Sequence, residues 1–208
     1  REWSAEVLSG LKTGTTSDAV GKALIDTVQR FDIPHQHFVD FLHSMEMDLT
    51  VTEYKTFDDL YEYVYGSAAV IGLEMVPILG GDTVNSLSAA KDLGVAFQLA
   101  NFIRDVAEDL DRGRIYLPLA ELAEHGVTPE MLRARILTPQ IISALKFQIA
   151  RVRQLQKAAE PESLYLSKPE IEKKIRDTRK AMEKAAKDLD FMQAARLRDE
   201  IKSLQERI

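Results

Sequence analysis

Apolar residues recur at helical spacing along almost the whole 208-residue chain, whereas the alternation typical of strands is scarce. Long helices are expected over residues 17–30, 60–78, 86–110 and 139–159. Further helices should open at Pro34 and Pro129, because proline is well tolerated in a first turn. Residues that commonly cap helices stand at other expected starts, among them Asp18, Thr56, Ser167 and Asp190. The pattern predicts an all-α fold.

The composition narrows the classes of function. The chain lacks cysteine, which excludes disulfides, thiolate metal sites and a cysteine nucleophile, and which suits a reducing cytosol. A net charge of −6 argues against direct nucleic-acid binding, which needs a basic surface. No apolar run approaches the roughly 20 residues of a membrane span, and no secretory signal is recognisable. We expect a cytoplasmic location with at most peripheral membrane contact.

The composition changes abruptly at residues 158–162, and the chain beyond is rich in Lys, Glu, Arg and Ala. This change predicts two pieces, residues 1–162 and residues 163–208. In the second piece, apolar stripes at helical spacing flank a turn at residues 189–191. Each stripe needs an apolar partner, so the two helices are expected to pair as a short antiparallel hairpin.

One polar strip lies on the otherwise apolar helix expected over residues 86–110. At about 100° per residue, the strip covers a face roughly 100° wide. Its members are Gln98, Asn101, Asp105, Glu108, Asp109 and Arg112. Asn101, Asp105 and Asp109 are spaced i, i+4 and i+8, which aligns three oxygen donors. Mg²⁺ prefers oxygen ligands and shares them with phosphates, so this row could bind a diphosphate through the metal. The spacing alone equally allows a solvated acidic face that pairs with arginines along the helix.

The strip and its neighbours resemble a known family. The order Gln98-x-x-Asn101-x-x-Arg104-Asp105-x-x-Glu108-Asp109 resembles the second aspartate-rich motif of phytoene and squalene synthases. The family pattern continues in Arg112-Gly-Arg114-Ile-Tyr116-Leu-Pro118, and further matches are the segment Tyr63 to Gly72, Met45 to Asp48, and Tyr54. The resemblance covers residues 1–162 and is closest to bacterial phytoene synthases. It implies a partial isoprenoid-synthase helical bundle in this piece, followed by the short hairpin.

The resemblance implies Mg²⁺-dependent head-to-head condensation of two prenyl diphosphates, either geranylgeranyl or farnesyl diphosphate. The reaction would pass through a cyclopropylcarbinyl diphosphate to a hydrocarbon. By this resemblance Asn101, Asp105 and Asp109 would hold Mg²⁺. Gln98, Arg104, Arg114 and Tyr116 would contact the diphosphate or the substrate, and Tyr63 would line the pocket.

The family also has a first D-x-x-x-D motif, which should lie just before the segment at Trp3, and further C-terminal helices. We therefore expect the chain to lack both, and no catalytic residue can be assigned. Half of a metal cluster in an open cavity predicts little or no synthase activity from this chain alone. His35, His37 and His43 lack the spacing of a metal site and are expected at a loop or at the edge of the core.

The C-terminal piece resembles the UVR module of the excision-repair subunit UvrB. The matching segments are Ser167 to Ile171, Ala185 to Phe191 and Ala194 to Ile201. The resemblance implies a protein–protein hairpin that pairs with another UVR hairpin, in its own dimer or in UvrC. A generic charged hairpin is the alternative. For the whole chain, three functions stay open: a prenyltransferase fragment, an interaction module, and an artificial fusion without joint biology.

Overall fold

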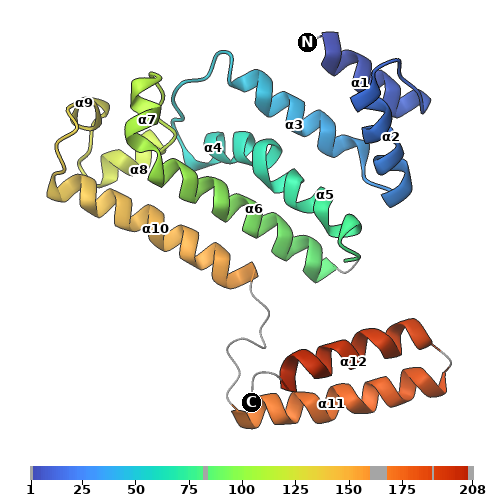
Figure 1. The fold of residues 1–208 in the computed structure, drawn as a ribbon. Coiled ribbons are helices and arrows are strands. Elements are labelled where there is room, and N and C mark those ends of the chain that lie inside the picture. Colours follow the sequence, from blue (N-terminus) through green and yellow to red (C-terminus); the bar gives the residue numbers. More distant parts are fainter. Residues whose placement is uncertain (1, 82–83, 160–167, 189, 206–208) are drawn as a thin grey trace. The chain divides into compact units, whose positions relative to one another are not determined.

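The computed structural model describes residues 2–81, 84–159, 168–188 and 190–205, and helices account for most of them (Figure 1). The chain forms two compact units, Arg1–Ala159 and Glu160–Ile208. The predicted all-α fold is confirmed. Among the described residues, one isolated parallel bridge joins Glu53 to Ile115. No helix in these ranges combines the length and apolar character of a membrane-crossing segment.

The first unit contains ten α-helices and one π-helical turn among its described residues. They are α1 (Glu2–Thr13), α2 (Ala19–Phe31), α3 (His35–Met47), α4 (Phe57–Val64), η1 (Tyr65–Ala69), α5 (Val70–Ile78), α6 (Val84–Arg104), α7 (Val106–Asp111), α8 (Leu119–Glu124), α9 (Pro129–Arg133) and α10 (Pro139–Ala159). Helix α5 packs against α3 and α6, and α10 packs along α6 (Figure 1). Helix α6 is thus the central element; it carries Gln98 and Asn101 of the predicted polar strip, and the other members lie on or next to α7.

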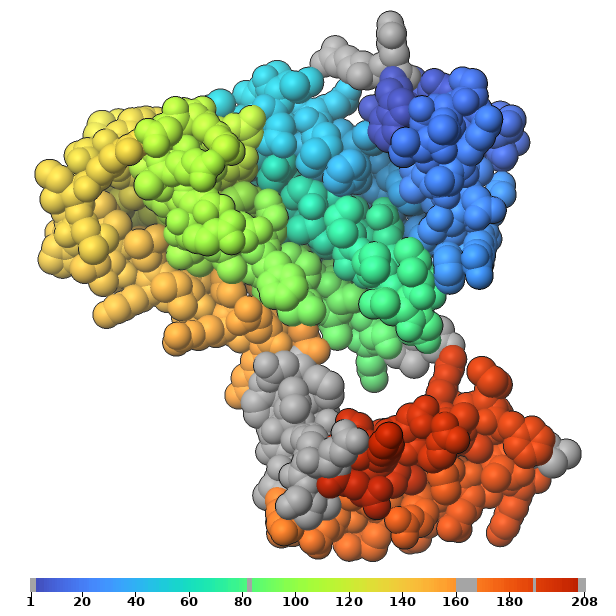
Figure 2. Space-filling model, viewed as in Figure 1, coloured from blue at the N-terminus to red at the C-terminus, as the bar shows by residue number. Residues whose placement is uncertain are grey.

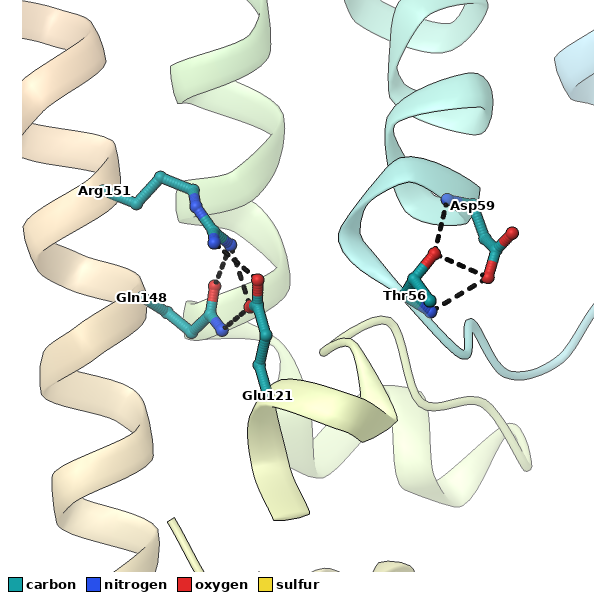
Figure 3. Close-up of polar contacts among 5 residues, drawn as sticks. All are labelled: Thr56, Asp59, Glu121, Gln148 and Arg151. Carbon is teal, nitrogen blue, oxygen red and sulfur yellow. Dashed lines mark hydrogen bonds and ion pairs between the residues drawn. The ribbon is translucent and has the colours of Figure 1, made fainter. Parts of the chain in front are cut away.

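The predicted caps are present. The Asp18 carboxylate accepts a hydrogen bond of 2.6 Å from the Gly21 amide at the start of α2. Thr56 and Asp59 form a reciprocal capping box at the start of α4 (Figure 3). Each cap satisfies amide groups that the first helical turn leaves without partners.

Two predicted continuous helices are interrupted. The helix expected over residues 60–78 contains the π-helical turn η1, and Ser44 donates a buried hydrogen bond of 2.9 Å to the Tyr63 carbonyl just before it. The helix expected over residues 86–110 breaks at Asp105, whose φ of −98° and ψ of 10° lie outside the helical range. The prediction of an unbroken helix was therefore wrong. Aspartate is a weak helix former that favours cap positions, and here it precedes α7.

Helix α6 approaches both η1 and α5 closely at two points where a glycine faces backbone. A Cβ atom at Gly72 would lie 2.3 Å from the carbonyl oxygen of Ala90, and one at Gly94 would lie 2.5 Å from that of Ala68. Both distances are too short for any side chain. The two glycines therefore allow a backbone-to-backbone contact that larger residues would push apart.

An ion pair ties α10 to α8 (Figure 3). The Arg151 guanidinium donates two hydrogen bonds to Glu121, of 2.5 and 2.9 Å, and Gln148 donates a third of 2.7 Å. The same guanidinium lies 3.9 Å from the ring centroid of Phe57 on α4. Although burial acts to raise it, the pKa of Glu121 is held below its usual value by the hydrogen bonds from Arg151 and Gln148. Arg151 thus links α10 to both α8 and α4.

The second unit is the predicted hairpin. Helices α11 (Lys168–Lys187) and α12 (Phe191–Gln205) pack on each other around Ile171, Ile175, Ile201 and Leu204. The predicted cap at Asp190 is confirmed, because its carboxylate accepts a hydrogen bond of 3.0 Å from the Gln193 amide. The expected cap of α11, Ser167, lies outside the described residues.

Glu74 is an unusual member of α5. Its Oε1 atom is buried and has no hydrogen-bond partner among the described residues. Burial raises the pKa of Glu74 from 4.5 to about 7. Between these values the folded state binds more protons than the unfolded state, so this residue lowers stability as the pH rises.

We expect Glu74→Leu to raise the free energy of unfolding, and the gain to be larger near pH 8 than near pH 5. The reason is that the wild-type carboxylate must ionise in an apolar environment as the pH passes about 7. Urea unfolding at both pH values measures the difference. Glu124→Leu, at an exposed site on α8, is the control and should show no such dependence on pH. An equal gain at both pH values for Glu74→Leu would contradict the expectation.

Candidate active site

The residues of the predicted strip lie along α6 and α7 with a graded exposure. Gln98, Asn101, Asp105 and Asp109 are partly buried. Glu108 and Arg112 are exposed and pair with each other at 2.5 Å. The inner part of the strip is therefore distinct from an ordinary solvated face.

Arg104 and Asp105 form a bidentate pair. The Arg104 Nε and Nη2 atoms each lie 2.7 Å from one oxygen of the Asp105 carboxylate. The hydrogen bond from Arg104 holds the pKa of Asp105 below its usual value. The Arg104 side chain is 70% exposed, so its guanidinium remains open to an incoming anion.

The pKa of Asp109 is shifted in the opposite direction from that of Asp105. Burial raises the pKa of Asp109, and the negative charge of Asp105 raises it further. A divalent cation between these carboxylates would relieve that repulsion, and both residues offer the hard oxygen atoms that Mg²⁺ prefers. Asn101, one helical turn before Asp105, carries an amide oxygen of the same hard type. Across the described ranges, no three acidic or histidine side chains are grouped closely enough to hold a metal by themselves.

The turn after α7 directs Arg114 back toward the strip. Gly113 adopts a φ of +75°, the left-handed conformation that favours glycine. The amide of Arg114 then donates a hydrogen bond of 2.8 Å to the Asp109 carbonyl, and that of Gly113 donates one of 3.1 Å to Leu110. These two bonds form the glycine-based helix end known as the Schellman motif. The Gly113 turn therefore brings the backbone of Arg114 next to that of Asp109.

Arg114 binds protein groups in this structure. Its Nη1 atom lies 2.5 Å from the Asp48 carboxylate and 2.8 Å from the Tyr116 hydroxyl, and its Nη2 atom lies 2.7 Å from the Asp48 carbonyl. The hydrogen bond to Asp48 raises the pKa of Arg114 above its usual value. The guanidinium is thus held rigidly at the end of α3.

Four aromatic rings pack beside this ion pair. Tyr116 stacks on Phe102 with ring centroids 4.1 Å apart, and Tyr54 and Tyr63 lie within 6 Å of Tyr116. Tyr63 is 5% exposed and donates a hydrogen bond of 3.2 Å to Asp48. Burial raises the pKa of Tyr63, so the hydroxyl stays protonated and donates. Phe102, Asp109, Arg114 and Tyr116 also line a cavity of about 10 Å³, room for about one water molecule.

An exposed apolar surface adjoins the polar strip. Phe97, one helical turn before Asn101, is 56% exposed, and Leu93 lies a further turn back. In Figure 2 the green atoms of α6 lie next to the teal atoms of α5. Along α6 an apolar face thus leads directly into the partly buried oxygen donors.

Residues 1–193 match the family model described as squalene/phytoene synthase. The chain belongs to this family. The match extends past the predicted boundary near residue 162 and includes α11, and nothing in the comparisons supports the resemblance to a UVR module or an artificial fusion.

Plant phytoene synthases are among the similar curated proteins. Phytoene synthase 1, chloroplastic, from Zea mays is 42% identical over 159 residues, which cover 74% of this chain and 39% of that protein. Phytoene synthase, chloroplastic, from Narcissus pseudonarcissus is 42% identical over 164 residues, which cover 76% of this chain and 38% of that protein. The chain therefore spans about two-fifths of the length of these relatives.

Solved structures share the fold. Squalene synthase HpnC from Alicyclobacillus acidocaldarius matches with a TM-score of 0.71 and 26% identity, over 74% of this chain and 59% of that one. A dehydrosqualene synthase in complex with ligand also gives a TM-score of 0.71. Its 23% identity, over 100% of this chain and 78% of that one, supports the fold alone.

The structure adds Asp48 to the candidate site. The sequence placed Asp48 at a family position without a role, and the structure joins it to Arg114 and Tyr63. Asp48 and Arg114 are 66 residues apart in the sequence, so no local pattern could have paired them.

We expect Asp48→Asn to lower the free energy of unfolding by about 1.5–3 kcal/mol, the usual contribution of a hydrogen bond to a charged group. The substitution keeps the size of the side chain but removes the charge that faces Arg114. Urea unfolding measures the loss. Asp26→Asn, at an exposed position on α2, is the control and should change stability by less than about 0.5 kcal/mol. Equal effects of the two substitutions would show that the Asp48 pair contributes nothing.

Proposed function

We propose that this chain binds a prenyl diphosphate through Mg²⁺, as part of a head-to-head prenyl condensation of the phytoene synthase type. One observation carries the proposal. On α6 the exposed apolar residues Leu93 and Phe97 lead within one turn to Asn101 and then to Asp105. A prenyl diphosphate has the same two parts, an apolar chain and a polyanionic head.

The side chains divide the binding between head and tail. Asn101, Asp105 and Asp109 would hold Mg²⁺, which when bound would neutralise the diphosphate and assist its departure. Arg104 is exposed beside Asp105 and would donate to phosphate oxygens, since a guanidinium suits that geometry. Gln98, on the same strip, would add an amide donor to the diphosphate.

The ion pair between Asp48 and Arg114 would position the aromatic residues that form the inner wall of the proposed binding site. Asp48 holds Arg114 and Tyr63, and Arg114 in turn holds the Tyr116 hydroxyl. We propose that Arg114 and Tyr116 contact the substrate from this fixed position. Tyr63 would close the pocket against water, because its ring is buried among the other aromatic rings.

The binding test uses a farnesyl diphosphate analogue whose ester oxygen is replaced by sulfur, so that it ionises slowly. We expect calorimetry to show binding that needs Mg²⁺ and is lost on adding EDTA. Asp105→Asn with Asp109→Asn should weaken it by at least about tenfold for each lost carboxylate, roughly 1.4 kcal/mol each. Glu108→Gln is the matched control, because Glu108 lies on the same motif but pairs with Arg112. Binding that is indifferent to Mg²⁺, or equal loss in the control, would refute the proposal.

The expectation of little or no turnover by this chain alone stays a prediction. Mg²⁺ held by one strip of oxygen donors would neutralise one diphosphate, whereas the condensation consumes two prenyl diphosphates. Incubation of the purified chain with Mg²⁺ and radiolabelled geranylgeranyl or farnesyl diphosphate, followed by extraction into hexane, would detect a hydrocarbon product. Phytoene from geranylgeranyl diphosphate, or dehydrosqualene from farnesyl diphosphate, above the background of a boiled sample would contradict this expectation.

A second candidate function belongs to the hairpin, proposed here as an interaction module of residues 163–208. Phe191 and Met192 are 67% and 73% exposed at the start of α12, although the rest of the hairpin surface is strongly charged. Such a pair is a favourable contact for another helical hairpin, including one from a second copy of this chain. The cytoplasmic location and the boundary near residue 162 stay predictions.

We expect the chain to dimerise in a concentration-dependent way through this surface. Replacing Phe191 and Met192 with serine should shift sedimentation equilibrium toward the monomer, because it removes the exposed apolar area. Leu137→Ser is the matched control, since Leu137 is 68% exposed but lies in the other unit. A monomer at all concentrations, or a dimer that survives the double substitution, would exclude self-association through these residues.

A further inference from the structure

A second pocket lies in the first unit, away from the polar strip. It has a volume of about 200 Å³, is open to solvent on one side, and is lined by residues of α1, α2, α3 and α5. Apolar side chains form most of its wall, among them Trp3, Val7, Leu24, Phe38, Phe41 and Ile71. An apolar cavity of roughly 150 Å³ can hold a molecule of the size of benzene, so this one has room for a single ring with a short substituent.

Glu74 gives the pocket one charged group. It is the sole titratable residue among those that line the pocket, and its buried Oε1 atom has no hydrogen-bond partner among the described residues. Burial alone accounts for the shift in its pKa, so no neighbouring cation stabilises the carboxylate. A buried carboxylate without a partner costs free energy, and a ligand that supplied a positive charge and hydrogen-bond donors would recover it.

The aromatic rings favour the same kind of ligand. Trp3, Phe38 and Phe41 line the pocket together with Glu74. An ammonium group is attracted to the faces of aromatic rings, and carboxylate together with rings is a common way to recognise an organic cation. A diphosphate is excluded by the same wall, which holds a carboxylate and no basic side chain.

We propose that this pocket binds a small organic amine, with its apolar body among the aromatic side chains and its ammonium group on Glu74. The site is separate from the magnesium strip and does not depend on the proposed prenyl diphosphate binding. It belongs to the first unit alone, since all the residues that line it lie between Trp3 and Glu74.

Trp3 is the single tryptophan of the chain and lines the pocket, so its fluorescence reports directly on occupancy. The probes are benzylamine and its neutral counterpart benzyl alcohol, titrated into the full chain without Mg²⁺. We expect a saturable change in emission with benzylamine, at an affinity at least about tenfold higher than with benzyl alcohol, as one charge-assisted hydrogen bond allows. No saturable change, or equal affinity for the two probes, would overturn the proposal.

Substitutions locate the site. Glu74→Gln keeps the size of the side chain without its charge and should weaken benzylamine binding by about tenfold or more. Glu74→Leu should lose it as well while remaining folded, which thermal unfolding followed by circular dichroism would verify. Two controls should retain wild-type affinity: Glu124→Gln on α8, and the Asp105→Asn, Asp109→Asn variant of the strip. Unchanged binding in Glu74→Gln, or loss in either control, would contradict a separate site at Glu74.

Discussion

The close contact between the backbones of α5 and α6 is the constraint on which the site depends. Gly72 lets α5 touch the Ala90 carbonyl of α6, and Gly94 lets α6 touch the Ala68 carbonyl of the adjoining turn η1. With this contact fixed, Phe102 on α6 is buried among the aromatic rings, while Phe97 stays at the surface. The polar strip lies between these two sides of the helix. A larger separation of α5 and α6 would leave Phe102 without its aromatic partners and the polar strip without that side of its surroundings. The proposed binding chemistry therefore depends on this packing.

The second constraint joins segments that are distant in the sequence. Residues 52–55 run beside residues 115–120, where the amides of Ile115, Leu119 and Ala120 donate to carbonyl groups of the earlier segment. This places the end of α3 beside the turn at Gly113, so that Asp48 can reach Arg114. The inner wall is therefore built from two loops held by backbone hydrogen bonds, and its side chains have little freedom to move.

The sequence predicted the parts of this structure that local chemistry determines. Caps at Asp18, Thr56 and Asp190 were identified correctly, because each satisfies nearby amides. The break at Asp105 was not predicted, since the hydrophobic period runs through it without change. The pairing of Asp48 with Arg114 was also beyond local patterns, because it depends on how two loops meet. For the candidate site, the sequence predicted the residue types and the face, and the three-dimensional packing determined their partners.

The pair between Arg104 and Asp105 affects how a diphosphate would bind. Both oxygens of Asp105 are held by Arg104, so a cation that binds Asp105 must compete with that guanidinium. A diphosphate arriving with the cation offers Arg104 an alternative anion of higher charge, and the exposed side chain can turn toward it. Metal and diphosphate would then each favour the binding of the other through one exchange of partners at Arg104. An unaccompanied cation gains no such compensation, so the strip is suited to binding a metal–diphosphate complex rather than free Mg²⁺.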